Sequence, residues 1–357
     1  MVVPMDAREF VDMVVLGLGP AGLALAHRAQ ARGWEVLGVD PQTQWPNTFG
    51  VFADELPLWL ADAPGIDTAA EVRMPGWRRT FRRTYRILDG EALRRRFDTI
   101  PHYVGAAEQL DEQRVRLDDG RVIRARIIVD ARGARPAPVV QQAAGVFLDA
   151  PPQRRSVWMD FTRSGDTFSY VVPTPRGLLV EHTLLAGPAM PQEELRRRVA
   201  ADAAGLGTRT GETEDVLIPL GPGVDGAAYG ARAGMINPIT GYQVATAFKL
   251  VDATLDALAA GRTLPHRRLA WRVDDWLLRR GQAVLVALLD TPGATREFFA
   301  EVLALPEPLL WGLLTPGRPL ATMRGMAAVF LRLPWRLRVL VLRSVGRRMG
   351  AYERLPE

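Results

Sequence analysis

The sequence predicts an α/β protein, and three observations near its start lead to that fold class. A short β-branched apolar run, residues 13–16, is typical of a buried parallel strand. It leads into a glycine-rich turn, and residues 21–32 behind the turn are rich in alanine and leucine, as in a helix. A second strand is predicted within residues 33–40. Strand, turn, helix and strand in this order form the βαβ unit of a parallel sheet.

The turn has the spacing of a dinucleotide-binding loop and consists of Gly17, Leu18, Gly19, Pro20, Ala21 and Gly22. In such a loop the first glycine allows a tight turn, the second lets a phosphate approach the backbone, and the third lets the helix pack closely against the strand. The free amides and the dipole at the start of the helix favour a pyrophosphate. The segment therefore predicts a Rossmann-type fold that binds the ADP half of a dinucleotide, with a purely structural turn as the alternative.

Two acidic residues follow predicted strands and extend this site. Asp40 matches the carboxylate that binds the ribose hydroxyls, and an acid at this place disfavours the 2′-phosphate of NADP. A later apolar run, residues 127–129, leads into Asp130 and Gly133, which resembles the strand end that returns to the nucleotide in two-domain flavoproteins. We therefore expect FAD as the cofactor, although a plain strand and turn would explain the later segment equally well.

Composition excludes several classes of protein. The chain has 357 residues, of which 48% are hydrophobic and 24% charged, so we expect a folded protein of more than one domain. The net charge of +5 suits an acidic surface as partner, but no nucleic-acid-binding module is present and no nucleic acid is expected. The absence of cysteine excludes disulfides, iron–sulfur ligation and a thiol nucleophile. The four histidines lack metal-ligand spacing, so no metal is expected.

Neither a secretion signal nor a spanning helix is predicted. Residues 1–13 mix acidic and basic side chains before the first apolar run, which enters the glycine turn. No uncharged apolar stretch approaches the roughly 20 residues of a membrane span. We therefore expect a cytoplasmic protein that is soluble or peripherally attached to a membrane.

Four segments resemble one family in the same order along the chain. Residues 44–55, QWPNTFGVFADE, resemble the tryptophan-proline-asparagine, glycine-valine and aspartate-glutamate signature of the lycopene cyclase family. FSYVVP at 168–173 is similar to the aromatic strand of that family, and LVEHT at 179–183 to its glutamate-threonine motif. GMINPITGY at 234–242 is similar to its late loop. The later segments 296–299, 305–306 and 323–330 resemble its helical tail, so the resemblance covers nearly the whole chain.

This layout predicts an α/β fold, α+β overall, with three parts. The Rossmann-type FAD-binding domain is expected to be discontinuous and to comprise residues 8–60, 110–145 and 215–260. The β-sheet substrate domain is expected to comprise residues 61–109 and 146–214. From residue 264 to 357, apolar and arginine-rich stretches interrupted by prolines predict a helical C-terminal region.

The resemblance implies the family's reaction, which closes the end of a linear carotenoid such as lycopene into a six-membered ring without net oxidation. A proton adds to the terminal double bond, a second double bond attacks the cation, and a proton leaves. Such chemistry needs an acid, a dry pocket and a stabiliser of the cation. The matching motif makes Glu181 the expected acid, and strand alternation puts it on one face with Leu179 and Thr183. From the residues alone, a strand glutamate that faces solvent is the alternative.

Reduced FAD is the expected stabiliser of the cation, with NADPH or another donor as the external reductant. The late-loop residues expected at the cofactor are Gly234, Met235, Pro238 and Gly241. Aromatic faces also stabilise cations, and we expect one or two of the following at the pocket: Phe49, Trp158, Phe168, Tyr170 and Tyr242. In related flavin hydroxylases a glycine-aspartate pair holds the ribityl chain, whereas here Ala231 follows Gly230, so backbone groups must take that role.

Two other classes of function fit the same scaffold. An FAD-dependent hydroxylase or an isoprenoid double-bond reductase would change the mass of its substrate, and a non-catalytic flavin-binding or lipid-binding protein would need no acid. Within the cyclase interpretation, both β and ε rings and one or two cyclised ends are compatible with these residues, as is any oligomeric state. Where the family commonly has a doubled glutamate, this chain has Glu181 and His182.

A carotenoid must be taken from a bilayer, so a membrane surface is an expected partner. In residues 335–348 the apolar side chains Trp335, Val339, Leu342 and Val345 share one face of a helical wheel. Arg336, Arg343 and Arg347 share another face, with Arg338 at its flank. This pattern predicts a docking helix, with an ordinary packed helix as the alternative.

Overall fold

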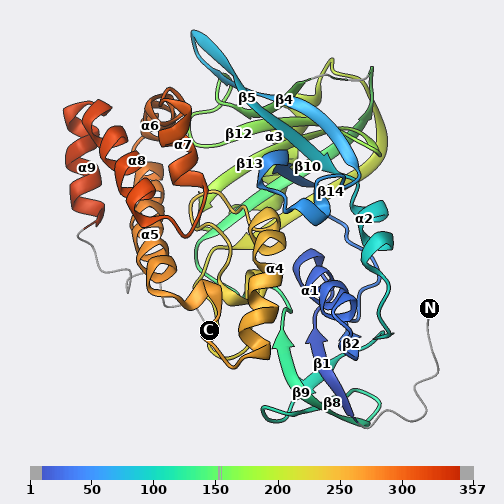
Figure 1. Ribbon diagram of the computed structural model, residues 1–357. Coiled ribbons are helices and arrows are strands. Elements are labelled where there is room, and N and C mark those ends of the chain that lie inside the picture. Colours follow the sequence, from blue (N-terminus) through green and yellow to red (C-terminus); the bar gives the residue numbers. More distant parts are fainter. Residues whose placement is uncertain (1–9, 152, 154, 346–357) are drawn as a thin grey trace.

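A computed structural model describes residues 10–151, 153 and 155–345, and within them the strands form two sheets (Figure 1). The first sheet has six strands in the order β6-β2-β1-β9-β8-β7. Their bounds are β1 Phe10–Leu16, β2 Val36–Val39, β6 His102–Tyr103, β7 Ala107–Gln109, β8 Arg114–Leu117 and β9 Val122–Asp130. β1 runs parallel to both β2 and β9, as the βαβ pattern predicts.

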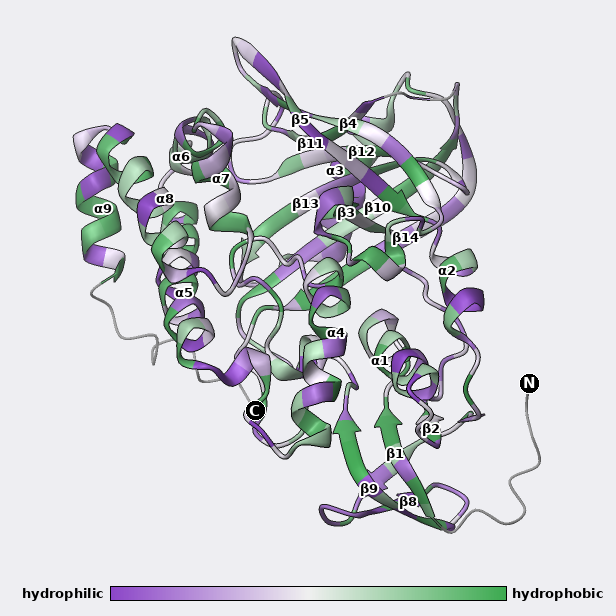
Figure 2. Ribbon diagram, viewed as in Figure 1, coloured by the Kyte–Doolittle hydropathy of each residue, from purple (hydrophilic) through white to green (hydrophobic). Residues whose placement is uncertain are grey.

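Helix α1 (Pro20–Ala31) follows β1 directly and packs beside α4 (Val244–Ala259), as Figure 1 shows above β1 and β9. Pro20 occupies the first turn of α1, where its missing amide hydrogen costs nothing. Met13 and Val15 are fully buried beneath these helices, and Figure 2 shows β1 and β9 in green, the colour of apolar residues, toward their arrowheads. A third helix, α2 (Gly90–Phe97), adds Leu93 and Phe97 to the same core.

The second sheet has eight strands in the order β14-β10-β13-β12-β11-β4-β5-β3. Their bounds are β3 Phe49–Phe52, β4 Gly65–Met74, β5 Trp77–Leu88, β10 Val140–Asp149, β11 Arg155–Asp160, β12 Phe168–Thr174, β13 Gly177–Gly187 and β14 Thr208–Pro219. Neighbouring strands are antiparallel except β4 and β11. Helix α3 (Gln192–Ala203) covers the face of this sheet that carries Val180.

Five helices form a stack along the opposite face of the second sheet (Figure 1). Their bounds are α5 Leu269–Leu289, α6 Ala294–Leu303, α7 Glu307–Leu314, α8 Pro319–Arg332 and α9 Trp335–Val345. Short 3-10 turns lie at η1 Ala53–Glu55, η2 Leu58–Leu60, η3 Gly230–Ala233 and η4 Pro265–Arg267. The stack and the sheet share a core in which Leu179 of β13 packs with Leu288 and Phe299.

The structure confirms the predicted fold class, including the helical C-terminal region as far as residue 345. Sheet membership differs from the expected division of the chain in a few strands. β6 and β7 lie in the first sheet although they fall within 61–109, and β3 lies in the second sheet although it falls within 8–60. β10 and β14 of the second sheet each cross an expected boundary, at 145/146 and at 214/215. The division into an FAD domain and a substrate domain stays a proposal, in which each strand is assigned to the domain of its own sheet.

Candidate active site

The glycine turn between β1 and α1 leaves open space where the sequence predicts a pyrophosphate. Gly17 has φ +93°, and a Cβ there would lie 2.6 Å from the Ala131 carbonyl oxygen. A Cβ on Gly22 would lie 2.0 Å from the carbonyl oxygen of Gly17, so both positions require glycine. A Cβ on Gly19 would meet no protein atom within 4 Å. Since no side chain within 10–151, 153 and 155–345 caps the start of α1, its amides are available to a phosphate at this place.

Three side chains converge on Leu18 in the middle of this turn. The Asp40 carboxylate accepts hydrogen bonds from the amides of Leu18 (2.5 Å) and Gln42 (2.7 Å). The Trp45 indole donates to the Leu18 carbonyl oxygen (2.8 Å), and Arg94 of α2 donates to the same oxygen (3.1 Å). The Arg94 guanidinium also lies 5.6 Å from the centre of the Trp45 ring. Trp45 of the family signature therefore fixes the shape of the glycine turn.

Asp130 and Gly133 lie at the end of β9, next to the glycine turn. Asp130 pairs with Arg132 (2.8 Å) and Arg232 (2.9 Å). Burial would raise the pKa of Asp130, but the hydrogen bonds from Arg132 and the charges of both arginines outweigh it and keep that pKa low. Gly133 has φ +81° and open space at its Cβ position. Asp130 thus serves an ion cluster that joins β9 to the segment before the late loop.

The late loop connects the glycine turn to the second sheet. A Cβ on Gly230 would lie 2.6 Å from the Ala21 side chain. Gly234 (φ +71°) packs on the backbone of residue 223, and Met235 is fully buried beside α1 and α4. The Pro238 carbonyl oxygen accepts a hydrogen bond from Gln282 of α5.

Gly241 closes the loop against the second sheet. It has φ +72°, and its Cβ would lie 1.6 Å from Oε1 of Gln141 on β10. This Oε1 atom and Nε2 of Gln243, at the start of α4, are buried without a hydrogen-bond partner among the described residues. Two unpaired buried polar atoms need a partner that the protein does not supply. The place between Gly241 and α4 therefore suits a polar ring with both donors and acceptors.

A cavity of about 670 Å³ extends from this place between the second sheet and the helical stack. Its volume lies within the usual range of small-molecule sites. Asn47, Thr48 and Gln243 belong to its lining, as do Phe330 of α8 and Val345 of α9. All five aromatic residues singled out from the sequence line it, more than the one or two expected: Phe49, Trp158, Phe168, Tyr170 and Tyr242.

Glu181 projects from β13 into this cavity. Its side chain is 9% exposed, and it forms no hydrogen bond to any residue that the structure describes. Burial, together with the nearby charge of Glu214, raises the pKa of the Glu181 carboxyl to about 8. The carboxyl is therefore protonated at neutral pH. Of the two faces that strand alternation allowed, the one shared with Leu179 is the cavity face, and the alternative of a solvent-facing glutamate is wrong.

Four hydrogen-bonded aromatic residues lie beside Glu181. The Tyr85 hydroxyl contacts those of Tyr170 (3.1 Å) and Tyr242 (2.9 Å), and the Trp158 indole donates to Tyr242. Tyr170 of β12 is the direct cross-strand neighbour of Glu181. Burial raises the pKa of all three hydroxyls well above the ordinary value, so they stay neutral. The cluster places aromatic rings and uncharged hydroxyls at the cavity wall.

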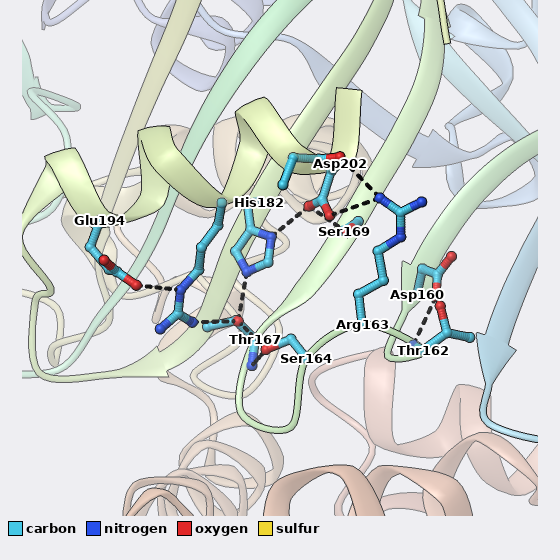
Figure 3. A network of polar contacts seen from close by, with 11 residues as sticks. Asp160, Thr162, Arg163, Ser164, Thr167, Ser169, His182, Glu194 and Asp202 are labelled. Atoms are coloured by element: carbon cyan, nitrogen blue, oxygen red, sulfur yellow. Dashed lines mark hydrogen bonds and ion pairs between the residues drawn. The ribbon is translucent and has the colours of Figure 1, made fainter. Parts of the chain in front are cut away.

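His182 points away from the cavity into a buried network (Figure 3). Its Nδ1 atom lies 2.6 Å from the Asp202 carboxylate of α3, and its Nε2 atom lies 2.7 Å from the Thr167 hydroxyl. Ser169 donates to the same carboxylate (2.6 Å). The network joins β12, β13 and α3 on the far side of the sheet. At the second position of the family's doubled glutamate, this chain thus has a histidine that faces away from the cavity.

The aspartate and glutamate of the family signature also bind within the protein. Arg83 of β5 pairs with Asp54 and Glu55 (2.9 Å each), and its guanidinium lies 4.6 Å from the centre of the Trp311 ring. These contacts join η1 to β5 and α7. Their role is to hold the helical stack on the second sheet.

Several residues at the site carry no signal in the sequence. Glu214, Arg94, Gln141 and Gln243 stand in unremarkable segments, and Tyr85 lies in an arginine-rich strand. Only their distance in space from Glu181 or the glycine turn distinguishes them. Glu214 could have been predicted as a site residue only if the pairing of β10 with β13 and β14 had been known.

The two-sheet architecture, with a glycine-rich turn after the first strand of a mixed sheet, is a fold that this chain shares with solved flavoproteins. A probable FAD-dependent monooxygenase from Pseudomonas aeruginosa has this fold, with a TM-score of 0.53 and 20% identity over 89% of this chain and 99% of that one. The chain itself belongs to the lycopene cyclase family, because the family model described as lycopene cyclase protein matches residues 12–318. The family resemblance of the motifs is thereby confirmed.

Two relatives span most of this chain. An uncharacterized carotenoid cyclase from Deinococcus radiodurans is 30% identical over 93% of each chain. The chloroplastic lycopene beta cyclase of Solanum lycopersicum is 27% identical over 84% of this chain and 73% of that one.

Proposed function

We propose that this protein cyclises the linear end group of lycopene or a related carotene, in an acid-initiated reaction without net oxidation. The observation that carries the proposal is Glu181, a buried carboxyl without a hydrogen-bond partner among the described residues, in an apolar cavity large enough for the end of a carotenoid. The enzyme class is then an isomerase of the intramolecular-lyase type. Family membership supports the same reaction.

The residues of the site fit FAD. The open space at Gly19 and the free amides of α1 suit the pyrophosphate, and the half-exposed Asp40 suits the ribose. Gly133 and the late loop would surround the ribityl chain, with Gln141 and Gln243 as partners for the ring. When bound in its reduced form, after reduction by NADPH or another donor, FAD supplies the negative charge that stabilises a nearby cation.

The chain's own groups supply the remaining chemistry. Glu181 holds a proton at neutral pH and can deliver it to the terminal double bond of a carotenoid in the cavity. Apolar walls exclude the water that would capture the cation. The aromatic faces of Trp158 and Tyr242 offer further stabilisation. The carboxylate left on Glu181 can accept the proton that the ring loses, which restores the acid.

The mass of the product tests this function. We expect cells that make lycopene and express the chain to accumulate cyclic carotenes of unchanged mass, and the purified protein to need reduced flavin. Chromatography and mass spectrometry of the pigments measure both. An added oxygen atom would instead indicate a hydroxylase, two added hydrogen atoms a double-bond reductase, and unchanged lycopene a flavin-binding or lipid-binding protein.

We also propose that the helical stack docks on the cytoplasmic surface of a membrane, from which the substrate enters the cavity. Of the fifteen strongly exposed large hydrophobic residues, nine lie between Leu269 and Val345, among the described residues. Trp335 is 77% and Leu342 63% exposed, so this face of α9 is not packed against the protein. Val345 both lines the cavity and is exposed, so the apolar face adjoins the cavity.

Some of the arginines on the polar side of α9 already bind other groups of the protein. Arg336 pairs with Glu297, Arg338 donates to the carbonyl oxygens of Leu331 and Leu333, and the predicted contribution of Arg347 lies outside the described residues. No helix among the described residues is long and apolar enough to cross a bilayer. Docking would therefore rest on the exposed apolar side chains more than on the arginines.

A further inference from the structure

Two buried glutamates face each other across one glycine of the second sheet. In the strand order β13-β10-β14, Gly145 of β10 is the direct neighbour of Glu181 on one side and of Glu214 on the other. Directly opposed residues in antiparallel strands project on the same face, so both glutamates point to the cavity side. A Cβ on Gly145 would lie 3.0 Å from Cγ of Glu181. Glycine thus leaves the space between the two carboxyls open.

The surroundings of the two carboxyls differ completely. Glu214 is 4% exposed and accepts hydrogen bonds from the Thr48 amide (2.6 Å), the Thr48 hydroxyl (2.8 Å) and Arg176 (2.7 Å). Donors of this kind, a guanidinium among them, stabilise an ionised carboxylate. In the part of the chain that the structure describes, no such donor binds the Glu181 carboxyl. Paired carboxyls in unequal surroundings divide into an acid and an anion.

The other groups around Glu181 cannot replace Glu214 as its charged neighbour. Tyr170 of β12, Tyr85 of β5 and Tyr242 before α4 are neutral hydroxyls. On the side of the helical stack, Arg280 of α5 lines the cavity, but it donates to the carbonyl oxygen of Val345 and lies on the Trp276 ring. Arg176 lies on the far side of Glu214 and pairs with it.

We propose that Glu214 is a positioning residue whose carboxylate, fixed by Arg176 and Thr48, keeps the proton on Glu181 across the gap at Gly145. The inference rests on the proposed function, in which Glu181 is the acid. Thr48 belongs to the segment that lines the flavin end of the cavity, so the same carboxylate also holds this segment beside the acid. Glu214 never touches the substrate in this account and acts only through Glu181.

The sign of the effect follows from the charges. Two neighbouring anions repel each other, so an ionised Glu214 raises the pKa of Glu181. Glu181 is the active acid only while protonated, so activity is lost as the pH rises through about 8. Glu214→Gln removes the anion and leaves the Arg176 charge uncompensated. Both changes lower the pKa of Glu181. Arg176→Gln removes a nearby cation and should shift the pKa of Glu181 upward.

Infrared difference spectroscopy of the purified, FAD-loaded protein measures the pKa of the Glu181 carboxyl and needs no cyclisation activity. A protonated carboxyl that titrates near pH 8 gives a C=O band that disappears on deprotonation, and Glu181→Gln must remove this band. We expect Glu214→Gln to lower its midpoint by about 1–3 pH units. Glu214→Asp, which keeps the charge, should leave the midpoint closer to that of the wild type. Arg176→Gln should raise the midpoint, and it tests the sign even if Glu214→Gln does not fold.

The outcomes separate this inference from the proposed function. Two results would overturn the electrostatic role of Glu214: an unchanged midpoint in folded Glu214→Gln, or a lowered midpoint in Arg176→Gln. Glu214 would then only hold Thr48 in place. The expected shifts, combined with a wild-type protein that does not cyclise carotenoids, would contradict the proposed function while the electrostatic pair stands. In an active enzyme the high-pH limit of the rate must move with the infrared midpoint.

Discussion

The glycine turn of the first sheet and the cavity beneath the second differ in how far apart along the chain their residues lie. The turn occupies six consecutive residues, 17–22, and the two glycines that it requires, Gly17 and Gly22, follow from the close approach of backbone atoms. The cavity combines residues from Asn47 to Val345, and each wall comes from a different element. Changes in the turn should therefore remove the cofactor and spare the cavity, whereas changes in the cavity should alter the chemistry and spare the cofactor. Cofactor binding and cyclisation can therefore be disrupted by separate substitutions.

The largest effect is expected at the turn. Gly19→Val should abolish FAD binding, because the branched side chain enters the space expected for the pyrophosphate. The backbone itself tolerates valine, since Gly19 has φ −61° and ψ 178°. Flavin absorbance of the purified protein and its circular dichroism should therefore show a folded, colourless variant.

A glycine outside the turn serves as the control for this variant. A Cβ on Gly90, at the start of α2, would come no closer than 3.9 Å to Phe49. Gly90→Ala should keep its FAD. A yellow Gly19→Val protein would show that the dinucleotide does not pass over this turn.

A smaller effect is expected at the outer face of the helical stack. Replacing Trp335 and Leu342 by serine should weaken flotation with lipid vesicles by about tenfold or more, because each exposed side chain loses on the order of 1.5–3 kcal/mol of apolar burial. Leu58, 96% exposed on the nucleotide half, gives the matched control Leu58→Ser, which should float like the wild type. Equal flotation of all three proteins would mean that α9 does not dock.

The same difference between the two halves explains what the sequence could predict. The strand, the glycine turn and Asp40 follow from local rules, and the structure has β1, α1 and β2 within a few residues of the predicted ranges. Glu181 was found through the family motif, but its burial depends on α5–α9 covering the sheet, which no local pattern encodes. Glu214 stands more than thirty residues further along the chain, and only the pairing of β10 with both β13 and β14 brings it near.

The central claim is that Glu181 supplies the proton that starts cyclisation, and substitutions of Glu181 test it most directly. The decisive experiment is pigment analysis of Glu181→Gln and Glu181→Asp in lycopene-producing cells, with FAD content measured in each purified protein. Glutamine is nearly isosteric and should keep the fold and the FAD, but it lacks the proton, so linear carotenoid should accumulate.

Glu181→Asp keeps the proton but retreats by one methylene, and a misplacement near 1 Å costs on the order of 10²-fold, so weak cyclisation is expected. Partial activity of Glu181→Gln would indicate that reduced flavin donates the proton and Glu181 only tunes the cation. Wild-type activity of Glu181→Gln with normal FAD content would contradict the account.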